Sequence, residues 1–342
     1  MLKRCILNIE GLLLELLRIP SPMGEENEKI AFLENYLSDY SPQIEQVSDS
    51  TANIWCRSEG KGPHIVFCAH MDTVPPAPGW NNPYSPLLDG DNIIALGSAD
   101  MQAGLALSIE LFKHYSDLGA NLTLLLTCDE EGWCRGINHA LNRIEGDLCF
   151  IPEPSSEAPV LKAPGRSLYE VTITARGGHA TEPGTSALVE ASNLILNLEK
   201  LKVDGSLAIL SLHSDSLGLT HPQEAKLILD RHHYNESDNI KETLLSLSDS
   251  ISITDYERPT PSPKPYSTPE TDLVKKFLSY CTKEQETTTS VGDFNFVATK
   301  MPTVILGPEG GNWHAPGEWV SRSSIDRVSQ IYVEFLNEIL SV

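Results

Sequence analysis

Residue types that bind divalent metals follow the apolar segments in the first half of the sequence. Segment 64–70 ends in His70, with Asp72 two residues further on, and segment 121–128 runs into an acidic turn. One imidazole and several carboxylates form a ligand set suited to a hard or borderline divalent ion, zinc above all. The residues concerned are His70, Asp72, Asp100, Asp129, Glu130, Glu131 and Glu153.

Each of these residues also has an ordinary structural explanation. A single histidine at a strand end often has a purely structural role. An aspartate before a helix, such as Asp100, is typical of an N-cap. The sequence Asp-Glu-Glu-Gly is common in turns. The carboxyl ends of parallel strands, however, meet at one edge of a sheet. The convergence of several such residues at that edge favours a metal site over coincidence.

The pattern of the first half predicts the sheet that would bring these residues together. Short apolar runs alternate with helical periodicity in a β-α-β-α-β order, which is typical of a mostly parallel sheet covered by helices. The spacing of apolar residues also predicts an amphipathic helix that ends before Pro20. The predicted strands are 64–70, 121–128 and 147–154, and the predicted helices are 101–115 and 134–144.

The pattern changes after residue 166. Signals from 167 to 257 follow the order β-α-β-β-α-β of a ferredoxin-like unit, and the Pro-rich stretch 258–269 is typical of a linker. A helix–strand–helix pattern then continues to the C-terminus. We expect one α/β domain made of residues 1–166 and 266–342, interrupted by a small inserted domain, 167–265. Two tandem domains are the alternative.

Composition and charge restrict the possible partners and setting. The 342 residues carry 25 Lys+Arg against 47 Asp+Glu, a formal net charge of −22, which argues against nucleic acid and against anionic membranes. Polar and charged residues interrupt the apolar N-terminal stretch, so neither a secretion signal nor a membrane span is expected. The seven cysteines are scattered and form no C-x-x-C pair, which favours a reduced, cytoplasmic setting.

Five motifs occur in a fixed order along the chain: His70-Met-Asp72-Thr-Val-Pro75, Gly97-Ser-Ala-Asp100-Met101, Asp129-Glu130-Glu131-Gly132, Glu153-Pro-Ser155 and His314-Ala-Pro-Gly-Glu318. Together they resemble the zinc aminoacylase/carboxypeptidase family of acetylornithine deacetylase, succinyl-diaminopimelate desuccinylase and bacterial glutamate carboxypeptidase. The resemblance runs from about residue 10 to the C-terminus, and it is specific because all five motifs occur together. It implies a di-zinc exopeptidase-like α/β fold whose inserted domain is a dimerisation lid.

The resemblance implies a role for each matching metal ligand. Asp100 would bridge two divalent ions, with zinc as the first expectation and cobalt or manganese as alternatives. His70 and Glu153 would complete one site, while Glu131 and His314 would complete the other.

Three further implications concern catalysis. Asp72 would lie behind His70 and fix the tautomer of its imidazole. Glu130 would stay free of metal and serve as the general base. A glutamate at position 153 resembles the deacylase and carboxypeptidase members, whereas the aminopeptidases and dipeptidases have aspartate there.

Other matching residues are implied to contact substrate. His179, in Gly-Gly-His-Ala, would reach the partner's active site across a dimer and stabilise an oxyanion; a turn histidine is the alternative. Arg231 resembles the lid arginine that clamps a substrate carboxylate, although some relatives place it one residue later, at His232 here. Asp293 and Asn295 resemble a segment lining the substrate cleft, with a structural role equally open.

The sequence departs from the family pattern around the bridging aspartate and in the lid. Gln102 follows Asp100-Met where relatives have lysine, and Gly218–Pro222 replaces the usual Asn-Val-Ile-Pro run, which leaves the substrate open. The leading hypothesis is a di-zinc amidohydrolase of acetylornithine deacetylase type acting on a small N-acyl amino acid or dipeptide-like substrate. The alternatives are a dipeptidase or carboxypeptidase, and a catalytically silent relative that only binds metal or acyl amino acids.

Overall fold

The computed structural model describes residues 7–235 and 239–340, which fold into two compact units. The first contains the described residues up to Lys162, then Ser267–Thr288 and the chain from Gly292 onward. The second contains Ala163–Tyr266 and the short stretch Thr289–Val291. Both ends of the chain therefore build the first unit, which carries all five motifs described above.

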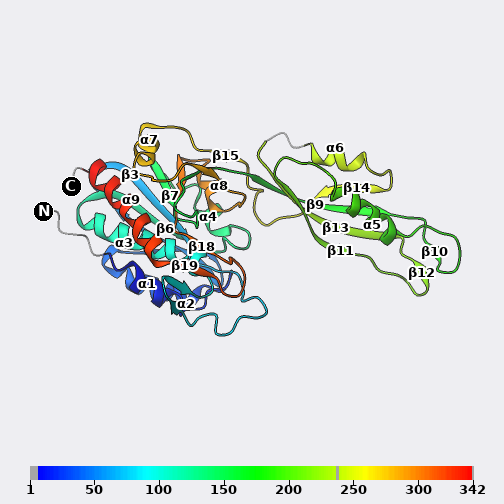
Figure 1. Cartoon of the computed structure of the whole chain (residues 1–342), viewed down its shortest axis with the longest axis horizontal. Coiled ribbons are helices and arrows are strands. Elements are labelled where there is room, and N and C mark those ends of the chain that lie inside the picture. Colours follow the sequence, from blue (N-terminus) through cyan, green and yellow to red (C-terminus); the bar gives the residue numbers. More distant parts are fainter. Residues whose placement is uncertain (1–6, 236–238, 341–342) are drawn as a thin grey trace. The chain divides into compact units, whose positions relative to one another are not determined.

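The first unit is built on a nine-stranded sheet in the order β1-β2-β6-β3-β7-β17-β8-β15, with β16 beside β8 (Figure 1). The four central strands β6, β3, β7 and β17 run parallel, whereas β1 and β2 pair antiparallel to their neighbours and β8 pairs antiparallel to β17. This confirms the predicted α/β class. The strands are β1 (Gln43–Ser48), β2 (Thr51–Ser58), β3 (Lys61–His70), β6 (Ala120–Thr127), β7 (Leu148–Ile151), β8 (Val160–Ala163), β15 (Tyr266–Ser267), β16 (Glu286–Thr287) and β17 (Thr303–Ile305).

Helices cover the central strands, which explains why those strands are apolar along most of their length. Helix α3 (Ala103–Asp117) packs on β3 and β6, and α9 (Arg322–Leu340) packs on β3 and α3. Phe150 of β7, Phe277 of α7 and Phe335 of α9 form one aromatic cluster, with ring centroids 4.5 Å apart for the first two. The other helices of this unit are α1 (Ile9–Leu16), α2 (Asn27–Tyr36), α4 (Arg135–Ala140), α7 (Asp272–Leu278) and α8 (Asp293–Val297), with a short 3₁₀ turn at Ser38–Tyr40.

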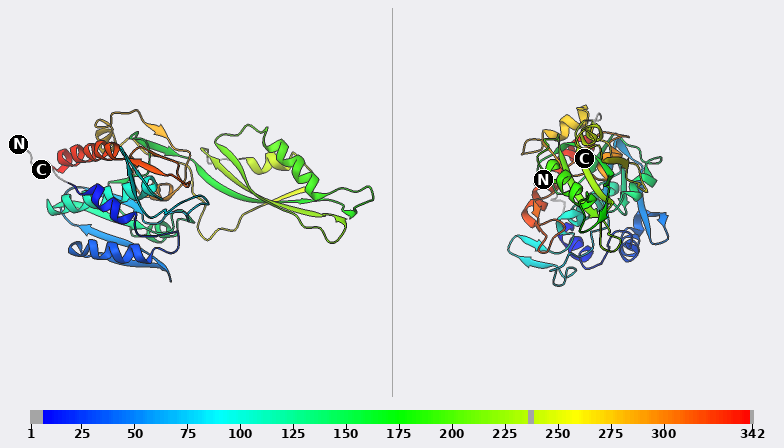
Figure 2. Two further views of the ribbon diagram at one scale, coloured as in Figure 1. Left: turned by 60° about the horizontal axis from the view of Figure 1, so that its bottom comes forward. Right: turned by 90° about the vertical axis from the view of Figure 1, so that its right-hand side faces the viewer.

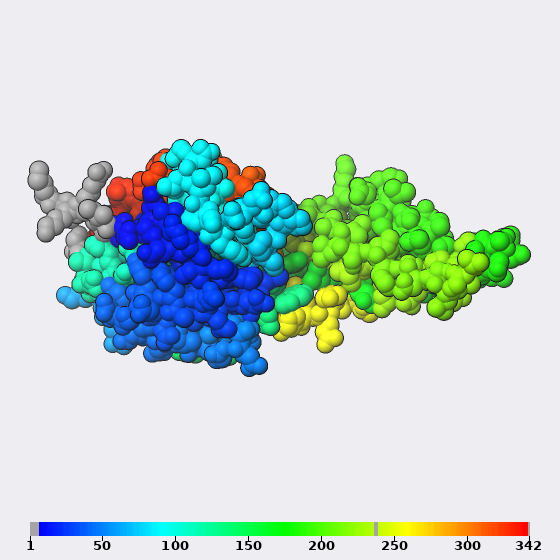
Figure 3. Space-filling model, turned by 90° about the horizontal axis from the view of Figure 1, so that it is seen from below, coloured from blue at the N-terminus to red at the C-terminus, as the bar shows by residue number. Residues whose placement is uncertain are grey.

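A second, smaller sheet of the first unit was not predicted from the sequence. Its order is β18-β19-β5-β4, and it joins the C-terminal motif to the segment before Asp100. Its edge strand β4 exposes Leu87 and Leu88. The segment around β4 is cyan in Figure 3 and lies on the face shown there. The strands are β4 (Leu87–Asp89), β5 (Asn92–Ile94), β18 (Gly310–Gly311) and β19 (Trp319–Ser321).

Two predicted helices differ from those observed. The helix predicted at 101–115 begins at Ala103, because residues 98–102 form an irregular turn with a cis peptide bond between Asp100 and Met101. The helix predicted at 134–144 is only Arg135–Ala140, because Cys134 adopts a left-handed conformation (φ 52°) before it and residues 141–143 form a turn after it.

The second unit follows the predicted order β-α-β-β-α-β. Its antiparallel sheet has the order β11-β13-β9-β14, and Figure 2 shows its two helices lying along one face. Val171, Leu194, Leu227 and Leu244 belong to the core between helices and sheet. The elements are β9 (Gly165–Thr174), α5 (Ala187–Leu198), β11 (Ser206–His213), β13 (Glu224–His233), α6 (Ile240–Leu245) and β14 (Ile251–Asp255), with a small pair β10 (Gly178–His179) and β12 (Thr220–His221).

Candidate metal centre

The ends of three neighbouring strands bring the predicted metal ligands together. His70 is the last residue of β3, Glu131 follows β6 and Glu153 follows β7, so parallel pairing places all three at one edge of the sheet. Asp100 comes from the irregular turn before α3, and His314 comes from the connection between β18 and β19.

Asp100 lies between the two histidines. Its Oδ1 is 3.3 Å from His70 Nε2, and its Oδ2 is 3.6 Å from His314 Nε2. Glu153 Oε1 lies 3.6 Å from His70 Nε2, and Glu131 Oε2 lies 3.1 Å from His314 Nε2. The five side chains thus form two groups, one on each side of the Asp100 carboxylate.

The charges of these groups call for cations at this position. Burial raises the pKa of Glu153 well above its ordinary value, with neighbouring carboxylates adding to the effect. Hydrogen bonds to Asp100 and Glu131 raise the pKa of His314 to about 10. Glu131 Oε1 is buried without a hydrogen-bond partner. Three carboxylates and two imidazoles, with one oxygen unsatisfied, fit a pair of divalent cations.

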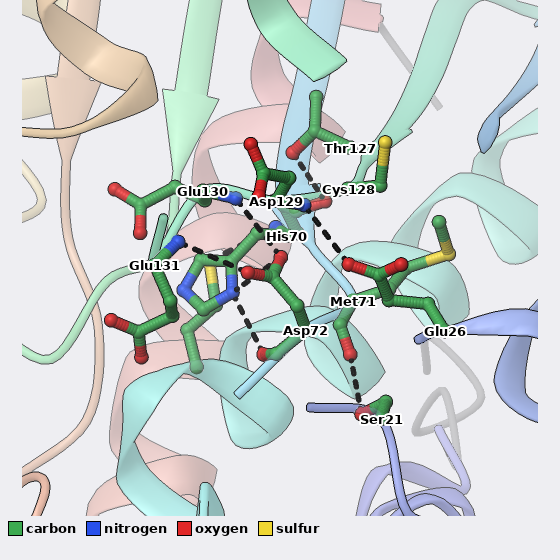
Figure 4. Close-up of polar contacts among 12 residues, drawn as sticks. Ser21, Glu26, His70, Met71, Asp72, Thr127, Cys128, Asp129, Glu130 and Glu131 are labelled. Carbon is green, nitrogen blue, oxygen red and sulfur yellow. Dashed lines mark hydrogen bonds and ion pairs between the residues drawn. The ribbon is translucent and has the colours of Figure 1, made fainter. Parts of the chain in front are cut away.

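Asp72 positions the backbone that carries Glu130 and Glu131. Its carboxylate accepts hydrogen bonds from the backbone N–H groups of both residues, at 3.2 and 3.0 Å (Figure 4). His70 Nδ1 is 3.0 Å from the backbone carbonyl of Asp72 and 3.6 Å from its carboxylate. The imidazole is therefore oriented mainly by the carbonyl oxygen, and the buried carboxylate anchors the acidic turn.

Glu318 anchors the turn that carries Asp100, and the sequence assigned it no role. Its carboxylate accepts hydrogen bonds from the backbone N–H groups of Gly97, Ala99 and Asp100, at 2.8 to 3.0 Å, and the side chain is 1% exposed. Burial raises the pKa of Glu318 to about 7. The sequence feature that could have indicated this role is the position of Glu318, an acidic residue directly before the apolar pair Trp319-Val320 and in the same motif as His314.

Glu26 and Lys29 are two further buried charges that the sequence did not reveal. Glu26 Oε1 accepts a hydrogen bond from the backbone N–H of Asp129, on the segment that leads to Glu130 (Figure 4). Lys29 Nζ donates to Gln102 Oε1 at 2.6 Å, and Gln102 Nε2 donates to the carbonyl oxygen of Met71. These contacts support the ligand-bearing segments from behind.

Glu130 lies beside the centre without joining either group. Its side chain leaves the backbone in a different direction from that of Glu131 (Figure 4). A Cβ atom added to Gly292 would lie 2.1 Å from Glu130 Oε1, so any other residue here would force this carboxylate to move. Burial raises the pKa of Glu130 well above its ordinary value.

Asp293 and Asn295 are buried in the first unit. Thr127 Oγ1 donates to Asp293 Oδ2 at 2.6 Å, and the backbone N–H of Gly292 donates to Asn295 Oδ1 at 3.0 Å. Both side chains are at most 2% exposed, so in this conformation they hold the segment at the start of α8. Direct substrate contact by either residue stays a prediction.

The second unit carries the remaining predicted residues. His179 is exposed on β10, and its Nδ1 lies 2.8 Å from Thr181 Oγ1. Arg231 is buried, and its Nη1 donates to the backbone carbonyls of Asp204, Ser206 and His232. Its guanidinium is thus engaged within its own unit, and the substrate roles of His179 and Arg231 stay predictions.

The fold and this centre define a metal-dependent hydrolase. A sequence model of the peptidase family M20/M25/M40 matches residues 66–338, and the chain belongs to this family. It is therefore a metal-dependent hydrolase of amide bonds, as the motifs predicted. Among the described residues, no helix combines the length and apolar composition that crossing a bilayer requires.

Individual relatives agree with this assignment. The chain is 30% identical over 190 residues to the succinyl-diaminopimelate desuccinylase of Sulfurovum sp. (strain NBC37-1), and the alignment covers 52% of each protein. It is 25% identical over 324 residues to the acetylornithine deacetylase of Aliivibrio fischeri (strain MJ11), covering 83% of each. A tripeptidase structure from Staphylococcus aureus has a TM-score of 0.83 at 18% identity and covers 98% of both chains, which establishes the fold.

Proposed function

We propose that this protein is a di-zinc amidohydrolase that removes an acyl group from the nitrogen of a small amino acid. The observation that carries the proposal is the position of Asp100, with one carboxylate oxygen toward His70 and the other toward His314. A carboxylate in this position suits two ions that share one ligand. Cobalt or manganese would satisfy the same ligands.

The ligands divide between two ions. His70 and Glu153 would hold one ion, Glu131 and His314 the other, and Asp100 both. Two such ions would lower the pKa of a water molecule and polarise the carbonyl of the scissile amide.

Glu130 would be the general base. It is next to the ligand Glu131 in sequence but is directed away from it, so its carboxylate is available to take a proton (Figure 4). It would accept the proton of the attacking water and pass it to the nitrogen of the leaving amine. Burial raises its pKa, which makes the protonated form accessible for the second transfer.

The substrate class rests on the resemblance and on the relatives' names. The two sequence relatives are named as a desuccinylase and a deacetylase, and Glu153 resembles the deacylase members. We therefore place an N-acyl amino acid of acetylornithine type first and a dipeptide second. In the second unit, His179 would stabilise the oxyanion in the active site of a partner subunit, which makes a homodimer through residues 167–265 part of the proposal.

The test is a hydrolysis screen combined with metal analysis. N-acetyl amino acids, N-succinyl amino acids and dipeptides are offered to the purified protein with added Zn²⁺ or Co²⁺, beside the variant Glu130→Ala. We expect two ions per chain in both proteins and a loss of turnover of about 10²-fold or more in the variant. Turnover retained by Glu130→Ala would refute the assignment of the base.

Two other results of the screen would select an alternative. A preference for dipeptides would favour a peptidase, and a protein that binds two ions but hydrolyses nothing would be a silent relative. His179→Ala should lower kcat without loss of metal, and an unchanged rate would leave His179 as a turn residue.

A further inference from the structure

A second group of possible ligands lies beside the metal centre. Side-chain atoms of Glu130, Cys134 and Asp293 all lie within 4.8 Å of one another. Cys134 is 6% exposed and Asp293 2%, while Glu130 is half-buried. None of the three belongs to the five ligands of the proposed di-metal centre.

The Asp293 carboxylate has unused capacity in this group. Thr127 Oγ1 donates to its Oδ2, and Oδ1 is buried with no stronger donor than the Cys134 thiol, which contacts this carboxylate. A thiol is only a weak donor, so a buried carboxylate oxygen that relies on it stays poorly satisfied. A bound cation would satisfy it.

The backbone fixes the cysteine in this position. Cys134 has a left-handed conformation (φ 52°) at the start of α4, and its backbone N–H donates to the Asp129 carbonyl oxygen at 2.7 Å. A thiolate with two carboxylates is a mixed soft and hard ligand set. Such a set selects Zn²⁺ or Cd²⁺ and disfavours Mg²⁺ and Ca²⁺, which require oxygen ligands.

We propose that Glu130, Cys134 and Asp293 form a third cation site, which takes a thiophilic divalent ion and inhibits the enzyme. Binding releases the thiol proton to solvent and forms a metal–sulfur bond. With both carboxylates ionised, the two carboxylates and the thiolate carry a charge of −3, which exceeds the +2 of the ion. This excess negative charge offsets the repulsion between the third ion and the two ions of the neighbouring centre.

Occupancy would block catalysis, because the Glu130 carboxylate would be held by the ion and could not accept a proton. This consequence rests on the proposed function of Glu130, whereas the binding itself does not.

The test uses Cd²⁺ and the intact protein, with the variants Cys134→Ser and Cys281→Ser. Of the two proposed sites, only this one has a thiolate ligand, so a sulfur-to-cadmium charge-transfer band in the ultraviolet distinguishes it from the histidine–carboxylate centre. Cys281 is a matched control, because it is a half-buried free thiol at the end of α7. We expect three Cd²⁺ per chain and the band in the wild type and Cys281→Ser, and two Cd²⁺ without the band in Cys134→Ser.

Inhibition provides the second measurement. With free Zn²⁺ controlled by a metal buffer, activity should fall at high Zn²⁺, and Cys134→Ser should move the midpoint of inhibition at least about tenfold higher. Absence of the band in the wild type, or a band that persists in Cys134→Ser, would overturn the proposal. A band in a protein that hydrolyses no substrate even at low free Zn²⁺, where this site is empty, would support the site and refute the proposed function instead.

Discussion

Replacing Lys29 by methionine should make the stability of the first unit less dependent on pH. Lys29 is fully buried on α2, and the hydrogen bond that its ammonium group donates to Gln102 Oε1 is 2.6 Å long. Burial lowers its pKa from 10.5 to about 7. Methionine has a similar length and removes the charge.

The size and sign of the effect follow from the pKa difference. Between pH 7 and 10.5 the unfolded state binds more protons at Lys29 than the folded state, so the wild type gains stability as the pH rises. A difference of about 3.5 pKa units corresponds to about 5 kcal/mol, and this cost of folding is complete below pH 7. Against it, methionine leaves Gln102 Oε1 without its donor, at a cost of about 1–3 kcal/mol at every pH.

Lys29→Met should therefore be more stable than the wild type at pH 6–7 and less stable at pH 10–10.5. Denaturant unfolding of the metal-free protein, followed by tryptophan fluorescence, measures this. All five tryptophans lie in the first unit, so their signal reports the unfolding of that unit alone. Lys275→Met, which removes a largely exposed lysine of α7, is the control and should show no crossover. A variant less stable than the wild type by the same amount at every pH would refute the reasoning.

Three further predictions concern the centre itself. Glu318→Gln should lower the affinity for metal and destabilise the first unit by about 2–4 kcal/mol, because an amide cannot accept all three backbone N–H hydrogen bonds. A metal titration measures the affinity and denaturant unfolding measures the stability. Unchanged values would contradict the anchoring role of Glu318. Gly292→Ala should lower kcat about tenfold or more while both metals are retained, because the new Cβ displaces the Glu130 carboxylate. An unchanged kcat would mean that Glu130 lies elsewhere during turnover. A chelator should remove the ion at His314 first, because the His314 side chain is 50% exposed and that of His70 only 1%. We expect metal loss in two phases, with the fast phase absent in His314→Ala. A single phase in the wild type would contradict this order.

Three of the proposed metal ligands could be placed together from the sequence, because each ends or closely follows a largely apolar strand. Parallel pairing of β3, β6 and β7 then requires that His70, Glu131 and Glu153 share one edge of the sheet. His314 could be associated with them only by family resemblance, because its contact with Glu131 joins residues far apart in the chain. The small sheet whose loop carries it consists of two- and three-residue strands, which leave almost no periodicity to detect.

The supporting charges could not be predicted. Lys29 lies on a helix with polar residues around its circumference, where a lysine normally faces water, and only the long-range contact with Gln102 reveals its burial. The family pattern has lysine at position 102, where this chain has Gln102. Here the ammonium group comes from Lys29 of α2, which donates a hydrogen bond to Gln102. A departure from the motif that seemed to concern the substrate is thus explained within the first unit.

Three buried carboxylates outside the ligand set share one function. Glu26 accepts the backbone N–H of Asp129, Asp72 accepts those of Glu130 and Glu131, and Glu318 accepts three from the turn that ends at Asp100. The hydrogen bonds that hold these segments come from backbone N–H groups, so they do not compete for the metals. The ligand carboxylates, in contrast, pair with the two histidines and with no lysine or arginine among the described residues, so divalent ions are the charges that would balance them. This division between anchoring and ligating carboxylates explains how a protein of net charge −22 can concentrate further negative charge at one site and still fold around it.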